Sequence, residues 1–383
     1  MRTLIDASVL AAIDEVAREE KLLPREASRA LLAAVKDVSA AYNGVGAGER
    51  DRRPQTLGPE ARSARLHFFL PRDLGKTYEA ARDLLPRLAV GATVRVVDVG
   101  AGLGASALGL AMLVRDTRPD ITLSLTLVDD DAAALRIAKK LFTRLFPALC
   151  ATAQFVAGSA SDFSPKGDAD LILACNVLCE LERGSALRAD RISALVHRFC
   201  RGVAPQGHVL LIEPALKTTT RALQTLRGRL LAVGFHIAAP CTHAKECPLL
   251  VNESDWCHED RAISLPSALI PIARGAGLHF EGLTFSYLLV TPTPPVPSRL
   301  PGLRGRVVAP PEGAKGRRAL VLCYEDANSG TSAKFERLDR HRGASHDAWT
   351  TAVRGSILAM NPWPEPGRIG AEVSIEAVEE GEP

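Results

Sequence analysis

A carboxylate and three glycines stand at regular spacing after a short apolar run. The run, residues 94–99, contains Asp98 and is followed by Gly100, Gly102 and Gly104. A strand that passes through a glycine turn into a helix is typical of the opening of a nucleotide-binding α/β sheet. Glycine lets the backbone turn sharply and lets a ligand approach without meeting a Cβ atom. The helix N-terminus that follows offers N–H groups to a polar ligand.

The acid at position 98 helps to choose among ligands. The stretch also fits the dinucleotide pattern G-x-G-x-x-A through Gly100, Gly102 and Ala105, so a dinucleotide is one alternative. A carboxylate two residues before the first glycine would face a pyrophosphate with like charge. S-adenosylmethionine has no phosphate and carries a cationic amino group and a sulfonium, so the acid favours this cofactor. The pattern D-x-G-x-G-x-G looks like the first motif of class I methyltransferases; a glycine turn without a ligand is the third interpretation.

Polar residues also follow the later strand-like runs. Residues 123–128 lead into Asp129, within L-V-D-D-D. A carboxylate at the end of the second strand can accept hydrogen bonds from both ribose hydroxyls in related folds. Asp162, after the third strand, is a candidate partner of the adenine amino group. Asn176, after the fourth, is a candidate for orienting a substrate or the methionine moiety, although a turn cap explains it equally well.

Three cysteines crowd a polar stretch at residues 239–260. Cys241, Cys247 and Cys257 are spaced as C-x5-C and C-x9-C, and each stands beside a proline, histidine or tryptophan. Three thiols in so short a polar stretch are hard to explain as packing, and they indicate metal ligation. His258 would complete a Cys3His zinc site, although the spacing is not that of a zinc ribbon. Four further cysteines lie in apolar runs and are expected to pack as small hydrophobes: Cys150, Cys175, Cys179 and Cys200.

These side chains need a scaffold of alternating strands and helices, which residues 91–238 supply. The apolar patterns predict strands at 94–99, 121–128, 152–157, 169–174 and 207–213, and helices at 103–115, 131–145, 184–201 and 218–233. Such alternation predicts a parallel, doubly wound sheet. The run at 278–290 is expected to close the sheet. The predicted fold class is therefore α/β, a Rossmann-like class I methyltransferase fold over residues 91–290 with the Cys-rich stretch as an insertion.

Further segments flank this predicted fold. Residues 1–90 carry helical spacing and predict a helical lid or docking region. After the fold we expect a Pro-rich linker, a small β module and a loose acidic tail, at 291–302, 303–360 and 361–383. From position 299 to 342 there are ten Lys or Arg residues and five Asp or Glu residues. This excess is a candidate RNA-facing patch, and an ordinary solvated surface explains it nearly as well.

Length and composition limit the class of protein. A chain of 383 residues has room for two or three domains, and 46% hydrophobic with 24% charged residues is typical of a globular protein. The net charge of +3 is too small to imply nucleic acid by itself. No apolar run is long enough to span a bilayer, and the N-terminus lacks the pattern of a signal peptide. We therefore expect a cytoplasmic protein without membrane or DNA among its partners.

Taken together, the chain resembles the methyltransferase-like proteins of the small ribosomal subunit, a family of predicted rRNA methylases with mitochondrial members that act in small-subunit assembly. The first motif is shared by many methyltransferases, whereas the succession of C-x5-C, W-C-H and F-S-Y-L is more specific. The matching pieces are V-D-V-G-A-G-L-G at 97–104, L-A-C-N-V-L-C-E-L at 173–181, L-I-E-P at 211–214, P-C-T-H-A-K-E-C-P at 240–248, W-C-H at 256–258, F-S-Y-L at 285–288 and V-L-C at 321–323.

The resemblance implies a [4Fe–4S] cluster, whose ligands by position are Cys241, Cys247, Cys257 and Cys323. Such a cluster would pin the β module to the methyltransferase fold. The resemblance also implies S-adenosylmethionine binding and action on small-subunit rRNA or its assembly. The chain is then either an rRNA methyltransferase or an inactive rRNA-binding factor. The loop A-C-N-V-L-C-E lacks the N-P-P-Y of base N-methylases, which slightly favours the second, and we assign no catalytic residue. A methylase of another substrate with structural zinc is the remaining alternative.

Overall fold

The computed structural model describes residues 5–43, 58–183, 185–295, 303–326, 329–341 and 347–378. Most of the linker expected at 291–302 lies outside the described residues. So does the end of the expected tail, from residue 379 onward.

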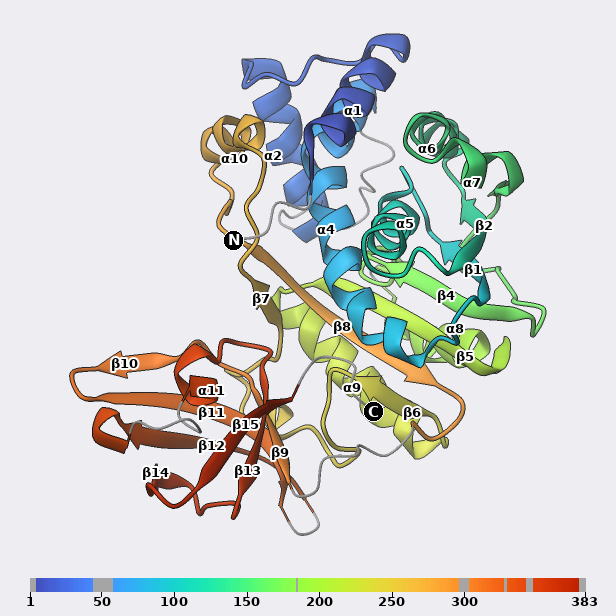
Figure 1. The fold of residues 1–383 in the computed structure, drawn as a ribbon. Helices are drawn as coiled ribbons and strands as arrows, with labels where there is room; N and C mark the ends of the chain where they lie inside the picture. The colour runs from blue at the N-terminus through green and yellow to red at the C-terminus, as the bar shows by residue number, and fades with distance from the viewer. Residues whose placement is uncertain are drawn as a thin grey trace.

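A mixed sheet of eight strands forms the centre of the described chain (Figure 1). Its order is β3-β2-β1-β4-β5-β8-β6, and β7 pairs with β8. The first five of these run parallel, whereas β8 is antiparallel to β5, β6 and β7. The strands are β1 (Thr93–Val99), β2 (Thr122–Asp129), β3 (Gln154–Ala157), β4 (Ala169–Cys175), β5 (Val203–Pro214), β6 (His236–Ala239), β7 (Glu259–Arg261) and β8 (Leu283–Thr291). The predicted Rossmann-like α/β fold is confirmed.

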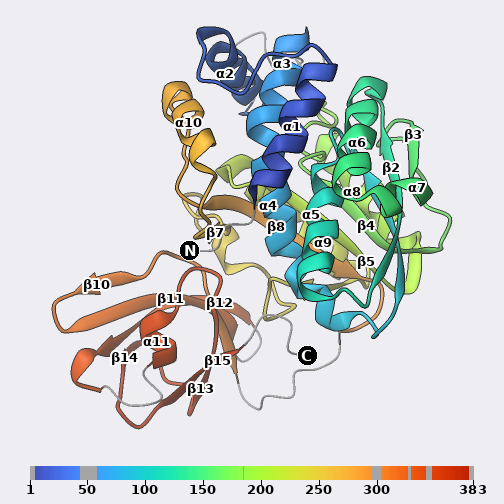
Figure 2. The same cartoon turned by 45° about the horizontal axis from the view of Figure 1, so that its top comes forward.

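Helices cover both faces of this sheet (Figure 2). One core cluster joins α5 and α6 to the sheet, and a second joins α8 and α9 to the opposite face. The helix α6 shows how the sequence produces this packing, because its buried positions recur every three or four residues and its N-cap Asp131 accepts from two backbone N–H groups. The helices are α5 (Ala105–Thr117), α6 (Ala132–Leu145), α7 (Pro147–Thr152), α8 (Arg188–Arg201), α9 (Lys217–Ala232) and α10 (Ile270–Ala276).

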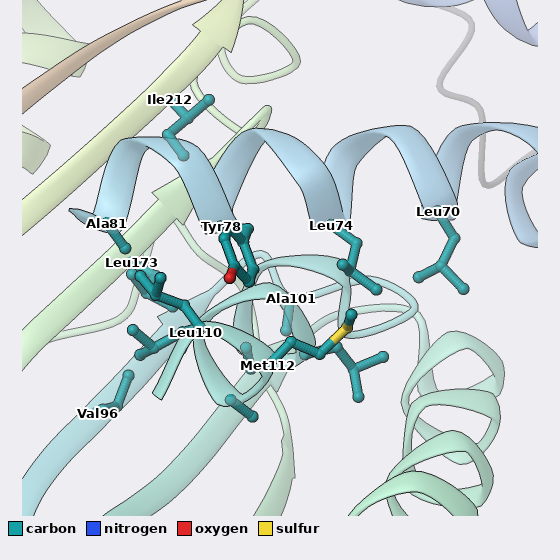
Figure 3. Packing of buried hydrophobic residues seen from close by; sticks show 14 of the residues in the cluster. Leu70, Leu74, Tyr78, Ala81, Val96, Ala101, Leu110, Met112, Leu173 and Ile212 are labelled. Atoms are coloured by element: carbon teal, nitrogen blue, oxygen red, sulfur yellow. The ribbon is translucent and has the colours of Figure 1, made fainter. Parts of the chain in front are cut away.

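The N-terminal helices pack onto the sheet through α4. In Figure 3, Leu70, Leu74 and Tyr78 of α4 face the buried side chains of α5 and the strands. The close approach depends on Gly109 of α5, where a Cβ atom would come within 2.4 Å of the Leu74 carbonyl oxygen. The segments are α1 (Ala7–Glu19), α2 (Arg29–Asn43), α3 (Gly58–Ala64), a π-helical turn (Arg65–Phe69) and α4 (Leu70–Ala80).

The α4 helix ends at Ala80, before the end of the helical spacing expected up to residue 90. Residues 81–83 and 85–87 form short 3₁₀ turns instead. Pro86 lacks a backbone N–H, and it disfavours helical backbone at the residue before it, so the α-helix cannot continue through this position.

The C-terminal residues form a second sheet, in which seven described strands are ordered β14-β12-β11-β9-β13-β15 with β10 on β11. Its core contains Phe335, Trp349 and Ile375, among others. The elements are β9 (Arg304–Val307), β10 (Glu312–Ala314), β11 (Arg317–Asp326), β12 (Ser329–Leu338), α11 (Asp347–Thr351), β13 (Ile357–Asn361), β14 (Gly367–Ile369) and β15 (Ser374–Val378). We call residues 303–378 the C-terminal module.

The loose tail expected after residue 361 is wrong for its described part. β14 pairs with β12, and β15 pairs with β13. Ile369, Val373 and Ile375 are buried in the core of the module, although an acidic residue, Glu372, stands between the first two in sequence. The acidic and Pro/Gly-rich composition suggested a loose tail, but apolar and polar residues alternate over a few positions, which is sufficient for edge strands.

Candidate cofactor pocket and four-cysteine site

A pocket lies at the carboxyl ends of the parallel strands, where α2, the π-helical turn and α4 cover it. Ligands of open α/β sheets bind at this edge. Of the predicted residues, Gly100, Gly102, Asp129 and Asn176 line the pocket. Its other lining residues are Tyr42, Arg65, Phe69, Leu70, Asp73, Thr77, Ala101, Leu103, Ala105, Ser106, Asp130, Ser159, Ala160, Ser161, Cys175, Val177, Glu180, Leu181 and Ile212.

The three glycines of the turn have different tasks. All have positive φ, at +71° for Gly100, +52° for Gly102 and +83° for Gly104. A Cβ atom on Gly100 would lie 2.4 Å from a methyl group of Val177, so this glycine lets the turn approach the loop after β4. A Cβ atom on Gly104 would instead lie 3.2 Å from Ala138 and 3.3 Å from Phe142. Gly104 therefore serves helix packing, and it does not line the pocket.

Asp98 lies beneath the turn rather than in the pocket. Its Oδ2 accepts hydrogen bonds from Ser106 Oγ at 2.5 Å and from the Ala107 N–H at 3.2 Å. Burial raises the pKa of Asp98 to about 7. The side chain is 1% exposed and fastens the end of β1 to the first turn of α5. Asp98 was expected to contact the cofactor directly, but it does not line the pocket and instead binds α5.

Asp129 connects the end of β2 to the glycine turn. Its two carboxylate oxygens accept from the Gly102 N–H at 2.7 Å and from the Asp131 N–H at 2.8 Å. Burial raises the pKa of this carboxyl group, and the two backbone donors oppose that effect. Each carboxylate oxygen can accept more than one hydrogen bond, so Asp129 retains acceptor capacity toward the pocket.

Asn176 presents a carbonyl oxygen that has no partner in the described structure. Its backbone is left-handed, with φ of 56°, and its N–H donates to the Ile212 carbonyl at 2.7 Å. Its side-chain Oδ1 is buried, lines the pocket and finds no hydrogen-bond donor among the described residues. Because a buried acceptor without a donor is costly, the atom is suited to a ligand that donates. Asp162 does not line the pocket; Ser159 and Ser161 stand there instead.

Arg65, which sequence reasoning did not single out, places a cation in the pocket. It lies in the π-helical turn ahead of α4, and its Nη1 is 3.2 Å from Asp131 Oδ2. A Cβ atom on Gly102 would lie 3.1 Å from Arg65 Nη2, so the guanidinium covers the middle of the glycine turn. The available signals were an arginine within an apolar stretch and the π-helical turn itself, which is frequent at functional sites.

The four cysteines that the resemblance selects line one pocket between the central sheet and the C-terminal module. Cys241, Cys247 and Cys257 come from the segment after β6, and Cys323 comes from β11. Burial raises the pKa of Cys257 to about 12 and also raises that of Cys247 and Cys323; neighbouring thiols raise all three further. The chain thus brings together four thiols that are far apart in sequence.

Nitrogen donors surround these thiols. Arg227 of α9 is 1% exposed, and its Nε donates to Cys241 Sγ at 3.2 Å. The same guanidinium donates to the Lys245 carbonyl at 2.7 Å, so it also fixes the loop that carries the cysteines. His243 Nε2 lies 3.3 Å from Cys323 Sγ. Nitrogen atoms of two different side chains therefore stand within contact of two of the four sulfur atoms.

The same region does not form a compact site for one metal ion. In the described ranges, no three His, Cys, Asp or Glu side chains are arranged to hold a single ion. His258 is engaged elsewhere, because its Nε2 contacts Arg354 and its ring stacks on Trp256 at 5.7 Å. Zinc requires its ligands about 2.0–2.3 Å from one point. The Cys3His arrangement considered from the sequence therefore has no geometric support.

The basic excess around residues 299–342 is only partly available to a ligand. Arg306 and Arg337 are 4% and 1% exposed, so neither can reach a phosphate. Arg318 donates to the Ala352 carbonyl, which holds α11 against β11. Lys315 and Arg317 are exposed near the β10–β11 turn, and Arg317 pairs with Glu336 at 3.2 Å. A phosphate-binding patch in this module is accordingly smaller than the sequence count suggests.

Fold and pocket together define a protein built on the class I methyltransferase fold. The chain belongs to the Rsm22 family, because the family model described as mitochondrial small ribosomal subunit Rsm22 matches residues 70–352. This match runs from α4 into the C-terminal module, and it confirms the resemblance drawn from the motifs. No curated protein matched the chain. No helix among the described residues is long and apolar enough to cross a membrane.

Methyltransferases are among the solved structures to which this chain is similar. Mitomycin 7-O-methyltransferase is 17% identical, with 62% of this chain and 71% of that chain covered and a TM-score of 0.37. A putative RNA methyltransferase from Pyrococcus horikoshii is 14% identical, with 67% and 95% covered and a TM-score of 0.35. A methyltransferase from Thiobacillus denitrificans, in complex with S-adenosyl-L-homocysteine, is 16% identical, with 52% and 71% covered and a TM-score of 0.30.

Proposed function

We propose that this chain is a small-ribosomal-subunit factor that binds S-adenosylmethionine and a [4Fe–4S] cluster and acts on small-subunit rRNA or its assembly. The ribosomal part rests on the family match, which spans residues 70–352 and therefore both sheets. The family description refers to mitochondria, so it does not support the cytoplasmic location expected from the sequence.

The observation that carries the cofactor proposal is the buried, unpaired Oδ1 of Asn176 in a pocket beside the glycine turn. This acceptor suits the ammonium group of the cofactor. Asp129, at the end of β2, is assigned to the ribose hydroxyls, and Ser159 and Ser161 to the adenine. Transfer of a methyl group from a sulfonium mainly requires alignment of the nucleophile, which binding can supply.

The cluster proposal rests on the donor set around one pocket. Four thiols with the buried Arg227 and His243 beside them fit cysteine ligation of a cluster. Each cysteine of such a cluster binds a different iron, so its ligands stand further apart than those of a single zinc ion. When bound, the cluster would supply a covalent link between the two sheets. The zinc alternative would require these thiols to close around one point.

The thiols near the cofactor pocket are not suited to act as nucleophiles, which favours a binding role for this chain over catalysis. Cys175 and Cys179 follow β4, where a nucleophile toward a pyrimidine base could stand. Burial raises the pKa of both well above its usual value, so neither thiol is set up as a nucleophile. We assign no catalytic residue and propose that methyl transfer, if it occurs, requires the ribosomal substrate to complete the site.

The test combines ligand binding with ribosome association. Protein purified without oxygen should bind S-adenosylmethionine in calorimetry, show the visible absorption of an iron–sulfur cluster, and cosediment with small ribosomal subunits. Incubation with assembling subunits and methyl-labelled cofactor separates the enzyme from the binding factor. Tight NAD binding without S-adenosylmethionine binding would overturn the cofactor assignment, and failure to cosediment would overturn the ribosomal role.

A further inference from the structure

Arg65 is the single cationic side chain among the described residues that line the cofactor pocket. The lining also contains the carboxylates of Asp73, Asp129, Asp130 and Glu180. The guanidinium is nine-tenths buried, and Asp131 accepts from one of its nitrogens, Nη1. The other terminal nitrogen, Nη2, lies where a Cβ atom on Gly102 would come within 3.1 Å of it, so the glycine makes room for the guanidinium at the turn.

Asn176 lines the same pocket and directly follows β4. Gly100 touches the loop after β4 through Val177, the residue that follows Asn176, whereas Gly102 touches Arg65. The pocket beside the turn thus holds an unpaired carbonyl oxygen and a guanidinium. An acceptor and a cationic donor in one pocket are complementary to the ammonium and carboxylate of an α-amino acid.

We propose that Arg65 binds the α-carboxylate of the cofactor's amino-acid end while Asn176 Oδ1 accepts from its ammonium group. This rests on the proposed S-adenosylmethionine function and assigns a partner to the carboxylate, for which the sequence offered no cationic residue. The carboxylate is the one anionic group of the cofactor, and the four acidic side chains of the pocket would repel it without Arg65. The first turn of α5 (Ala105–Thr117) adds the favourable end of a helix dipole beside the same turn.

The expected effect of each Arg65 substitution on cofactor affinity follows from the forked shape of the guanidinium. Arg65 can keep one nitrogen on Asp131 and direct the second at a carboxylate oxygen, whereas lysine supplies a point charge. Arg65→Gln removes the charge and Arg65→Lys keeps it. Arg29→Gln, at an exposed position that does not line the pocket, is the matched control.

The experiment compares S-adenosylmethionine with its decarboxylated analogue, which lacks only the carboxylate, by calorimetry on the full chain. Arg65→Gln should weaken S-adenosylmethionine about ten-fold or more. The same variant should leave the affinity for the analogue nearly unchanged. Arg65→Lys should recover part of the loss, and Arg29→Gln should change neither affinity. Thermal unfolding of each variant shows whether it is folded.

Equal losses for both ligands would overturn the proposal, because they would make Arg65 a structural residue. If wild type binds the analogue as tightly as S-adenosylmethionine, no group recognises the carboxylate and the proposal also fails. If wild type binds neither compound, the proposed cofactor itself is wrong, which is a distinct result. Should Arg65→Gln not fold, the comparison of wild type with Arg65→Lys on the two ligands decides the question.

Discussion

Glu259 of β7 and Arg306 of β9 form a buried ion pair that joins the central sheet to the C-terminal module. Their side chains are 2% and 5% exposed, and Arg261 also contacts Glu259 at 3.1 Å. The Arg306 guanidinium holds the pKa of Glu259 below its usual value despite burial. The two sheets therefore share a charge pair that neither could leave unpaired without cost.

Arg306→Met should destabilise the protein by about 3 kcal/mol, because Glu259 would remain buried with only part of its counter-charge. Chemical denaturation of the full chain measures this. The control is Lys334→Met, which removes an exposed pair with Glu312 and should cost under about 1 kcal/mol. Similar losses in the two variants would show that the buried pair does not join the sheets energetically.

Asp129→Ala should weaken S-adenosylmethionine binding by about 1.5–3 kcal/mol, the range for hydrogen bonds to a charged group. The substitution also releases the Gly102 N–H, so the turn that supports the cofactor loses an anchor. Calorimetry measures the affinity. Asp162→Ala is the control, because this residue does not line the pocket. An equal effect of both substitutions would contradict the assignment of the ribose to Asp129.

Cys323→Ser should abolish the brown colour of protein purified without oxygen and make the C-terminal module more sensitive to protease. The reason is that Cys323 is the one proposed ligand from that module. Cys175→Ser, which alters a buried thiol of the other pocket, should leave the colour intact. Metal analysis accompanies the spectrum. A colourless protein with one equivalent of zinc that does not respond to Cys323→Ser would exclude the cluster.

Asp98→Asn should make stability less dependent on pH. Burial raises the folded-state pKa of Asp98 from 3.8 to about 7, so the folded state retains a proton that the unfolded state loses above pH 4. The stabilising contribution is complete below pH 4 and is lost as pH rises toward 7. At pH 8 the variant should exceed wild type by on the order of 4 kcal/mol, because each pKa unit corresponds to about 1.4 kcal/mol. Denaturation at pH 4 and pH 8 tests this, and parallel curves would contradict it.

Lys315→Ala with Arg317→Ala should flatten the salt dependence of rRNA binding. Both residues are exposed near the β10–β11 turn. Each phosphate contact removed lowers the slope of log affinity against log salt by about 1. Arg368→Ala, at an exposed position on β14, is the control. An unchanged slope in the double variant would locate rRNA contact elsewhere on the surface.

The fold could be predicted because six strands of the central sheet and the main helices beside them have their own periodic patterns, whereas the short strands β6 and β7 were not predicted. The glycine turn and Asp129 can be recognised in the same way, since spacing within a few residues carries the signal. Arg65 could not be found from sequence, because its role depends on α4 packing against α5 through Gly109. Arg306 was misjudged for a related reason: a basic residue on a strand looks exposed until its partner Glu259 is placed.

Cys323 completes a pocket whose other three thiols precede it in the chain. A ribosome that makes this protein releases Cys241, Cys247 and Cys257 well before β11 can pair with β9. During that interval the nascent chain carries three of the four thiols, and the fourth, Cys323, is not yet in place. The surroundings of the translating ribosome must then keep these three thiols reduced. In a truncated product that ends before Cys323, the three thiols stay in that state permanently.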